Sequence, residues 1–206
     1  EAGIQVDAPL ALPASALTAM DWILTFGFSP LDEHGIALER AVKACAGKGY
    51  AIEDLVYAVQ SDKKASPAVK DALLNRLLSA MDWGILEKKG TPTEQLLQPG
   101  GISVIDVSHF ASLAQGWSVK GVLLGLLARQ IYQQRLMARK AEESEVMTGE
   151  QKSRVPLVWM IIDEAHEFLP AKGETPASSA LLTVVKQGRE PGISLALITQ
   201  QPNKLH

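Results

Sequence analysis

Two acidic residues that follow a short apolar run constrain the fold of this chain more than any other feature. Residues 157–162 are all apolar, and Asp163 and Glu164 follow them directly. A short run of this kind, rich in β-branched and aromatic side chains, is typical of a buried strand. A similar run covers 193–199, and a helix is predicted between the two, over 177–186. A helix between two such strands predicts an α/β fold with a parallel sheet and a right-handed connection.

The first part of the chain instead has apolar residues at helical spacing. Pro30 and the acids after Ser29 are typical of a helix start, because proline suits the first turn and acids favour the positive end of the helix dipole. Helices are predicted over 15–28, from Ser29 to Cys45, from Ile52 and from Ser66. We therefore expect a linker or frayed segment over 1–14, a helical subdomain over 15–90, and a partial α/β core over 91–206.

Between the helical part and the acidic pair, three further segments are predicted. The glycine-flanked, β-branched run 102–107 predicts another buried strand. Asp106, near its end, is expected either to lie near a bound nucleotide or to form a helix-start turn. A long helix is predicted over 118–141, and the charged residues 142–154 predict a solvated loop.

Composition narrows the class of protein. The 206 residues are 47% hydrophobic and 21% charged, which is typical of a globular domain and excludes a disordered chain or a rod. No apolar run approaches the ~20 residues of a membrane span, so no membrane partner is expected. The net charge of −3 gives no support for a strongly basic surface, although a local basic patch remains compatible with it. Cys45 is the only cysteine and cannot form an internal disulfide, so a cytoplasmic location is predicted.

Acids at the end of a buried strand suggest phosphate chemistry. In nucleoside-triphosphate hydrolases such an acid holds Mg²⁺ against the β- and γ-phosphates, and a neighbouring glutamate can orient the attacking water. Asp163 and Glu164 fit these two roles, and open α/β sheets bind ligands at this edge. Gln200 follows the second strand, where its amide could contact both the γ-phosphate and the water. The alternatives are that the acids simply end a strand and that Gln200 pairs with loop backbone.

At these residues the sequence resembles the HerA/FtsK superfamily of ATP-driven DNA motors, and the HerA-like branch more closely. The resemblance rests on 161–166, Gly188-Arg189 and 199–202, and it extends over about 30–206. It implies a RecA-like P-loop NTPase core that uses ATP and Mg²⁺. It also implies a hexameric ring around double-stranded DNA and a nuclease partner in DNA-end processing.

The same resemblance implies a role for each matched residue. Asp163 would bind Mg²⁺ directly or through water, and Glu164 would be the catalytic base. Gln200 would contact the nucleotide as a sensor. Arg189 would reach a neighbouring subunit's phosphate as an arginine finger, unless it is a surface arginine or pairs with Glu190. The four histidines show no metal-ligand spacing with Cys45, so no zinc site is predicted and His166 receives no role.

One element of the family pattern is absent from the sequence. No GxxxxGK motif followed by Ser or Thr occurs, and 46–50 lacks both the preceding strand and the hydroxyl residue. Gly47 and Gly49 are better explained as a helix end and a turn. We therefore expect a fragment, incomplete at both ends and inactive alone, with the phosphate loop upstream. A related motor of secretion or conjugation and a non-catalytic binding module both remain alternatives.

Overall fold

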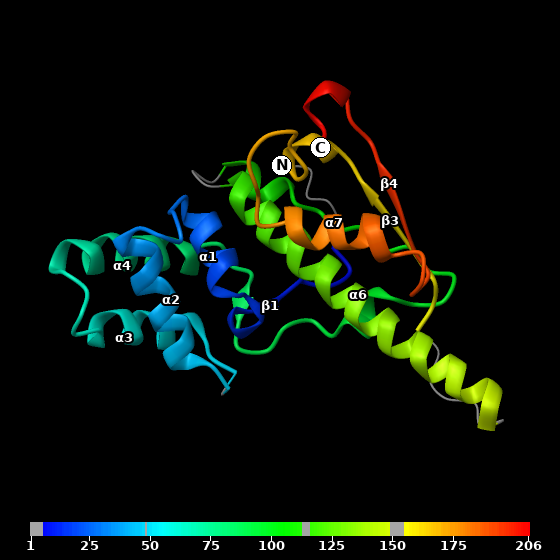
Figure 1. Ribbon diagram of the computed structural model, residues 1–206, viewed down its shortest axis with the longest axis horizontal. Coiled ribbons are helices and arrows are strands. Elements are labelled where there is room, and N and C mark those ends of the chain that lie inside the picture. The colour runs from blue at the N-terminus through cyan, green and yellow to red at the C-terminus, as the bar shows by residue number, and fades with distance from the viewer. Residues whose placement is uncertain (1–5, 48, 113–115, 149–154) are drawn as a thin grey trace. The chain divides into compact units, whose positions relative to one another are not determined.

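The computed structural model describes residues 6–47, 49–112, 116–148 and 155–206 (Figure 1). The chain divides into two compact units, the first formed by 1–23 and 28–91 and the second by 24–27 and 92–206. Its α-helices are α1 (Ala19–Phe26), α2 (Glu33–Cys45), α3 (Ile52–Ser61), α4 (Pro67–Met81), α5 (Thr93–Leu96), α6 (Gly116–Thr148) and α7 (Ser178–Gln187). None of the described helices is both long and apolar enough to cross a membrane.

The first unit is a helical bundle built on α2, α3 and α4. Each of these helices contributes apolar side chains that are almost completely buried, among them Leu38, Leu55 and Leu73. Two short parallel strands, β1 (Leu12–Pro13) and β2 (Leu86–Glu87), pair beside the bundle. The last residues of the segment expected to be a linker or frayed strand are therefore hydrogen-bonded into this unit.

Capping side chains begin two of these helices. Ser66 accepts a hydrogen bond from the Val69 N–H and precedes Pro67, as the sequence predicts for α4. The predicted start of α2 at Ser29 is wrong by several residues, because Asp32 is the cap. Its carboxylate accepts N–H groups from both Gly35 (2.7 Å) and Ser29 (3.0 Å), which closes 29–32 into a turn before the helix. These N–H groups also lower the pKa of Asp32.

The second unit places α6 and α7 against a parallel pair of strands. Strands β3 (Val158–Ile162) and β4 (Ile193–Leu197) pair in register from Val158 opposite Ile193 to Ile162 opposite Leu197. Apolar side chains of both helices and of β3 share one buried cluster. Mixed helices with small parallel sheets are compatible with the predicted α/β class.

One prediction about β3 is wrong, because the strand is not buried on both faces. Val158, Met160 and Ile162 face the helices and are buried, whereas Trp159 and Ile161 are 73% and 68% exposed. Side chains alternate between the faces of a strand. In the described part of the chain, α6 and α7 cover only one of these faces.

The expected strand over 102–107 is also absent from the described residues. This segment is irregular, and Ile102 and Val104 are 93% and 86% exposed. A β-branched run becomes a strand only where a neighbouring strand pairs with its backbone. Among the described residues, no backbone hydrogen bond joins this run to β3 or β4.

The predicted loop over 142–154 begins later than expected, because α6 continues to Thr148. Arg139 lies 3.6 Å from Glu142 and 3.3 Å from Glu143, at the three- and four-residue spacings that stabilise a helix. The charges that suggested a solvated loop therefore support an exposed helical turn. Residues 149–154 lie outside the described residues.

Candidate functional site

The acidic pair and the glutamine lie at the same edge of the β3–β4 sheet. Asp163 and Glu164 follow β3, and Thr199 and Gln200 follow β4. Because the strands are parallel, both of these segments leave the carboxyl edge. Backbone hydrogen bonds continue beyond the strands, from the Ile198 N–H to the Ile162 carbonyl and from the Ala165 N–H to the Ile198 carbonyl, both 2.9 Å. The two segments are therefore held side by side.

A sharp turn at Glu164 positions the two acids. Glu164 has φ 49° and ψ 43°, and among the described residues it is the one non-glycine residue with a positive φ. This left-handed conformation costs about 1–2 kcal/mol for a residue with a side chain. It leads into a short 3₁₀ helix, η3 (Ala165–Glu167), in which the Glu167 N–H donates to the Glu164 carbonyl. Strain of this kind clusters at functional sites.

The two carboxylates lie in different environments. Asp163 is exposed, and its Oδ1 accepts the Glu164 N–H at 2.9 Å. The Glu164 side chain is 38% exposed, but its Oε2 is buried without a hydrogen-bond partner in the described structure. Asp163 is therefore open to a solvated cation, whereas one oxygen of Glu164 is enclosed, 3.4 Å from His166 Nδ1.

His166 is a site residue that the sequence did not reveal. Its ring is buried among Glu164, Glu167, Thr199 and Gln201, and each ring nitrogen has a polar neighbour within 3.3 Å. In a sequence, a single histidine beside two acidic residues does not by itself indicate a functional site. The available signal was the combination of a histidine in the turn after one strand with a threonine at the end of the next.

The structure does not bring Arg189 to this edge. Arg189 is exposed and lies in the turn of 189–192 that precedes β4, so it occupies the amino edge of the sheet. A strand of five residues rises about 17 Å, which separates Arg189 from Asp163 and Glu164 within one chain. Gln200, in contrast, is exposed at the carboxyl edge beside Thr199.

Asp106 forms a local turn. The Ser108 N–H donates to its carboxylate at 2.8 Å at the start of the 3₁₀ helix η2 (Ser108–Ser112), and this bond lowers the pKa of Asp106. The helix-start alternative of the sequence analysis therefore describes its local structure.

The donor set fits a phosphate-bound magnesium ion better than a metal held by protein alone. No group of three or more potential ligands gathers among the described residues. Mg²⁺ commonly binds through one or two carboxylates and keeps waters and substrate phosphates as its other ligands. Exposed Asp163 can supply such a carboxylate.

Gly47, with φ 87° just after α2, is a helix-end glycine as predicted.

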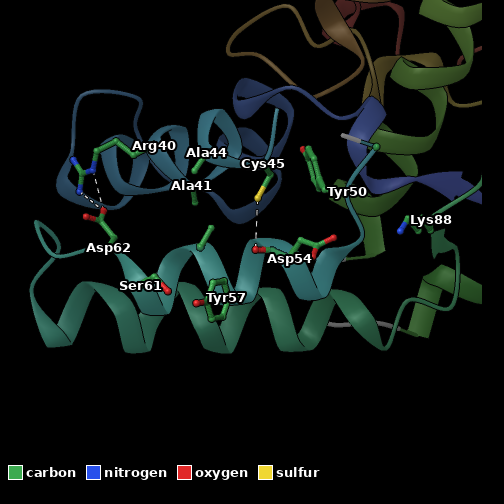
Figure 2. Close-up of a pocket in the computed structure, with 12 residues that line it drawn as sticks. Arg40, Ala41, Ala44, Cys45, Tyr50, Asp54, Tyr57, Ser61, Asp62 and Lys88 are labelled. Atoms are coloured by element: carbon green, nitrogen blue, oxygen red, sulfur yellow. Dashed lines mark hydrogen bonds and ion pairs between the residues drawn. The ribbon is translucent and has the colours of Figure 1, made fainter. Parts of the chain in front are cut away.

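The helical unit has a groove of its own between α2 and α3 (Figure 2). It has a volume of about 770 Å³. The Arg40 guanidinium at its wall donates twice to Asp62 Oδ2, at 2.9 and 2.6 Å. Burial, and then the charge of Asp54, raises the pKa of the Cys45 thiol, which donates to the Asp54 carbonyl. These groups are engaged within the fold, and the thiol is kept in its less reactive protonated form.

Comparison with known proteins gives two partial matches. No family model matches the chain. The chain is 26% identical over 122 residues to the DNA double-strand break repair helicase HerA of Pyrococcus furiosus, a match that covers 53% of this chain and 22% of the relative. It is 39% identical over 49 residues to the probable DNA double-strand break repair helicase HerA of Methanocaldococcus jannaschii, which covers 24% and 10%.

These matches support the HerA-like relationship that the sequence motifs indicated. The chain spans only about a fifth of the first relative and a tenth of the second.

Proposed function

We propose that this chain is part of an ATP-hydrolysing DNA motor, a HerA-like translocase or helicase that acts in DNA-end processing. The observation that carries the proposal is the meeting of Asp163 and Glu164 with the Thr199–Gln200 segment at the carboxyl edge of β3 and β4. The two relatives, both named as helicases of DNA double-strand break repair, give independent support.

In this proposal each residue at the edge has a separate task. Asp163 would hold Mg²⁺ directly or through water, and the bound ion would supply positive charge against the phosphates of ATP. Glu164 accepts the proton of the attacking water through its partly exposed carboxylate. Gln200 hydrogen-bonds the γ-phosphate or the water and reports whether the phosphate is present. The lysine and N–H groups that cradle phosphate come from a part of the RecA-like core outside this chain.

Arg189 fits this proposal only as a residue that acts on another subunit. Its place at the amino edge keeps it from the acids of its own chain. In a hexameric ring, the same edge would face a neighbour's nucleotide. Double-stranded DNA and a nuclease partner complete the proposal and are supported by the HerA-like relationship alone, and a cytoplasmic location is supported by the single cysteine.

The test uses the full-length protein that contains this chain. We expect Glu164→Gln to keep ATP and Mg²⁺ binding while lowering turnover about 10²- to 10⁴-fold, because the amide is nearly isosteric but a far weaker base. Asp163→Asn should weaken ATP binding and its Mg²⁺ dependence together. Phosphate release with duplex DNA and titration with a fluorescent ATP analogue measure the two effects.

Glu174→Gln is the matched control, because it makes the same chemical change at an exposed residue to which the proposal gives no role. It should hydrolyse ATP at the parent rate. If Glu164→Gln also does so while Asp163→Asn is silent, the acids only end a strand, and the non-catalytic binding module becomes the better explanation.

A further inference from the structure

His166 is a buried polar side chain at this edge that the proposed chemistry does not use. Its residue is only 6% exposed, and it lies in η3, immediately after the two acids. A buried polar ring is unfavourable unless its nitrogens have partners. Here the partners come from both segments of the site, so the ring connects them.

On one side of the ring, Nδ1 lies between the proposed base and the segment after β4. It is 2.9 Å from Thr199 Oγ1 and 3.4 Å from Glu164 Oε2. Thr199 Oγ1 also accepts the Gln201 N–H at 3.0 Å, which fixes the hydroxyl within its own turn. The buried Glu164 oxygen, which has no hydrogen-bond partner in the described structure, therefore faces a nitrogen anchored to the opposite segment.

On the other side, Nε2 lies 3.3 Å from Gln201 Nε2 and 3.2 Å from Glu167 Oε1. A neutral imidazole has one donor and one acceptor nitrogen. A Gln201 amide that donates to Nε2 requires the ring proton on Nδ1, whereas a Glu167 carboxylate that accepts from Nε2 requires it on Nε2; the coupling described below requires the first arrangement. A proton on Nδ1 points toward Thr199 and Glu164, the side that matters for the proposed base.

From this geometry we propose that His166 is a positioning residue that couples the Glu164 carboxylate to the Thr199–Gln201 segment. The inference rests on the proposed function. The His166 ring holds the base in the orientation set by the segment that carries the sensor Gln200. Any displacement of that segment by a bound phosphate then moves Thr199, the ring and the Glu164 oxygen together.

Three substitutions in the full-length protein test the coupling. His166→Ala removes both nitrogens. His166→Asn keeps an amide N–H near the position of Nδ1, and His166→Gln reaches only toward that of Nε2. We expect Ala and Gln to lower kcat about 10- to 100-fold with KM for ATP within about twofold, since a small misplacement of a reacting group has effects of this size. Asn should recover most of the loss. His206→Ala, at an exposed histidine, should leave kcat unchanged.

A double substitution separates positioning from a general packing role. If His166 acts through Glu164, His166→Ala should cause no further loss in a Glu164→Gln background. A packing role would instead lower kcat in both backgrounds and reduce the thermal midpoint of the Asn variant as much as that of the Ala variant. Either additive losses or the absence of rescue by Asn overturns the proposal.

A further measurement does not depend on ATP hydrolysis. In this 206-residue chain, the ¹⁵N shifts of the His166 side chain should show the proton on Nδ1, and Thr199→Val should change the Nδ1 signal. A proton on Nε2, or a spectrum unaffected by Thr199→Val, overturns the coupling. If Glu164→Gln leaves turnover intact while the ¹⁵N result holds, the proposed function fails and the contact itself stands.

Discussion

Arg135 of α6 is a charged residue with a side chain that is 1% exposed. Its Nε donates to the Pro191 carbonyl at 2.7 Å, and its Nη1 donates to Glu142 at 3.0 Å and to the Val155 carbonyl at 2.5 Å. Nη2 is buried without a hydrogen-bond partner in the described structure. A buried guanidinium is tolerated when most of its donors are paired, so this residue joins α6 to the two backbone segments that lead into β3 and β4.

Replacing this guanidinium should be costly. We expect Arg135→Leu to lower the free energy of opening of the second unit by at least about 2 kcal/mol, because each buried carbonyl left unpaired costs about 1–3 kcal/mol. Native-state hydrogen exchange of the β3 and β4 amides measures this free energy. Arg139→Leu, one turn later and 45% exposed, is the control and should change it by less than about 1 kcal/mol. Equal effects of the two would show that the buried bonds of Arg135 contribute little.

At the scale of elements, a glycine sets how closely the chain before α7 approaches α6. A Cβ at Gly125 would lie 2.5 Å from the Pro176 carbonyl oxygen and 3.0 Å from Ala177 Cα, both backbone atoms. A Cβ at Gly121, one turn earlier, would lie 3.3 Å from the Pro176 ring. The close approach therefore requires glycine at position 125, whereas position 121 has more room for a Cβ.

This pair of glycines gives a matched prediction. We expect Gly125→Ala to destabilise the second unit by about 1–3 kcal/mol, because the backbone must shift to admit the methyl group. Gly121→Ala should be neutral or slightly stabilising, since alanine is favoured over glycine in a helix by about 1 kcal/mol. Urea unfolding followed by circular dichroism compares the two. If Gly121→Ala lowers the free energy of unfolding as much as Gly125→Ala does, the closer backbone approach at Gly125 is contradicted.

At the scale of the whole molecule, the helical bundle and the α/β unit each have a core of their own, and the proposed chemistry lies in the second. That unit supplies the carboxylates and the amide of the site. The chain has no phosphate-loop motif, so lysine and a row of N–H groups are missing from the proposed machinery.

The chain alone is therefore expected not to hydrolyse ATP. Without the lysine and the N–H cradle, the charge of the triphosphate is not neutralised at the acids. Phosphate release with Mg²⁺, measured with and without duplex DNA, should stay far below about 1 s⁻¹, the low end of typical turnover numbers. Turnover at that rate would show that the site is complete within these 206 residues.

Features that depend on neighbouring residues could be predicted from the sequence. The sequence predicted the start of α4 at Ser66-Pro67, the glycine after α2 and the two strands, because capping and apolar spacing act within a few residues. The acids at the end of β3 and Gln200 after β4 were predicted to share an edge, since parallel strands require it. The caps and strands follow from rules that act within a few residues, and the shared edge follows from the parallel direction of the two strands.

The remaining features depended on which surfaces meet. The run 102–107 has the composition of a strand but no strand partner in the described structure, and β3 has helices on only one face. His166 became part of the site because a turn 33 residues later brings Thr199 to its ring. Arg189 lies far from the acids because it precedes β4, whereas the acids follow the parallel strand β3. The sequence alone determined the elements and the chemistry at their ends, whereas the tertiary structure decided the partners, because a contact between distant segments depends on packing that neither segment encodes by itself.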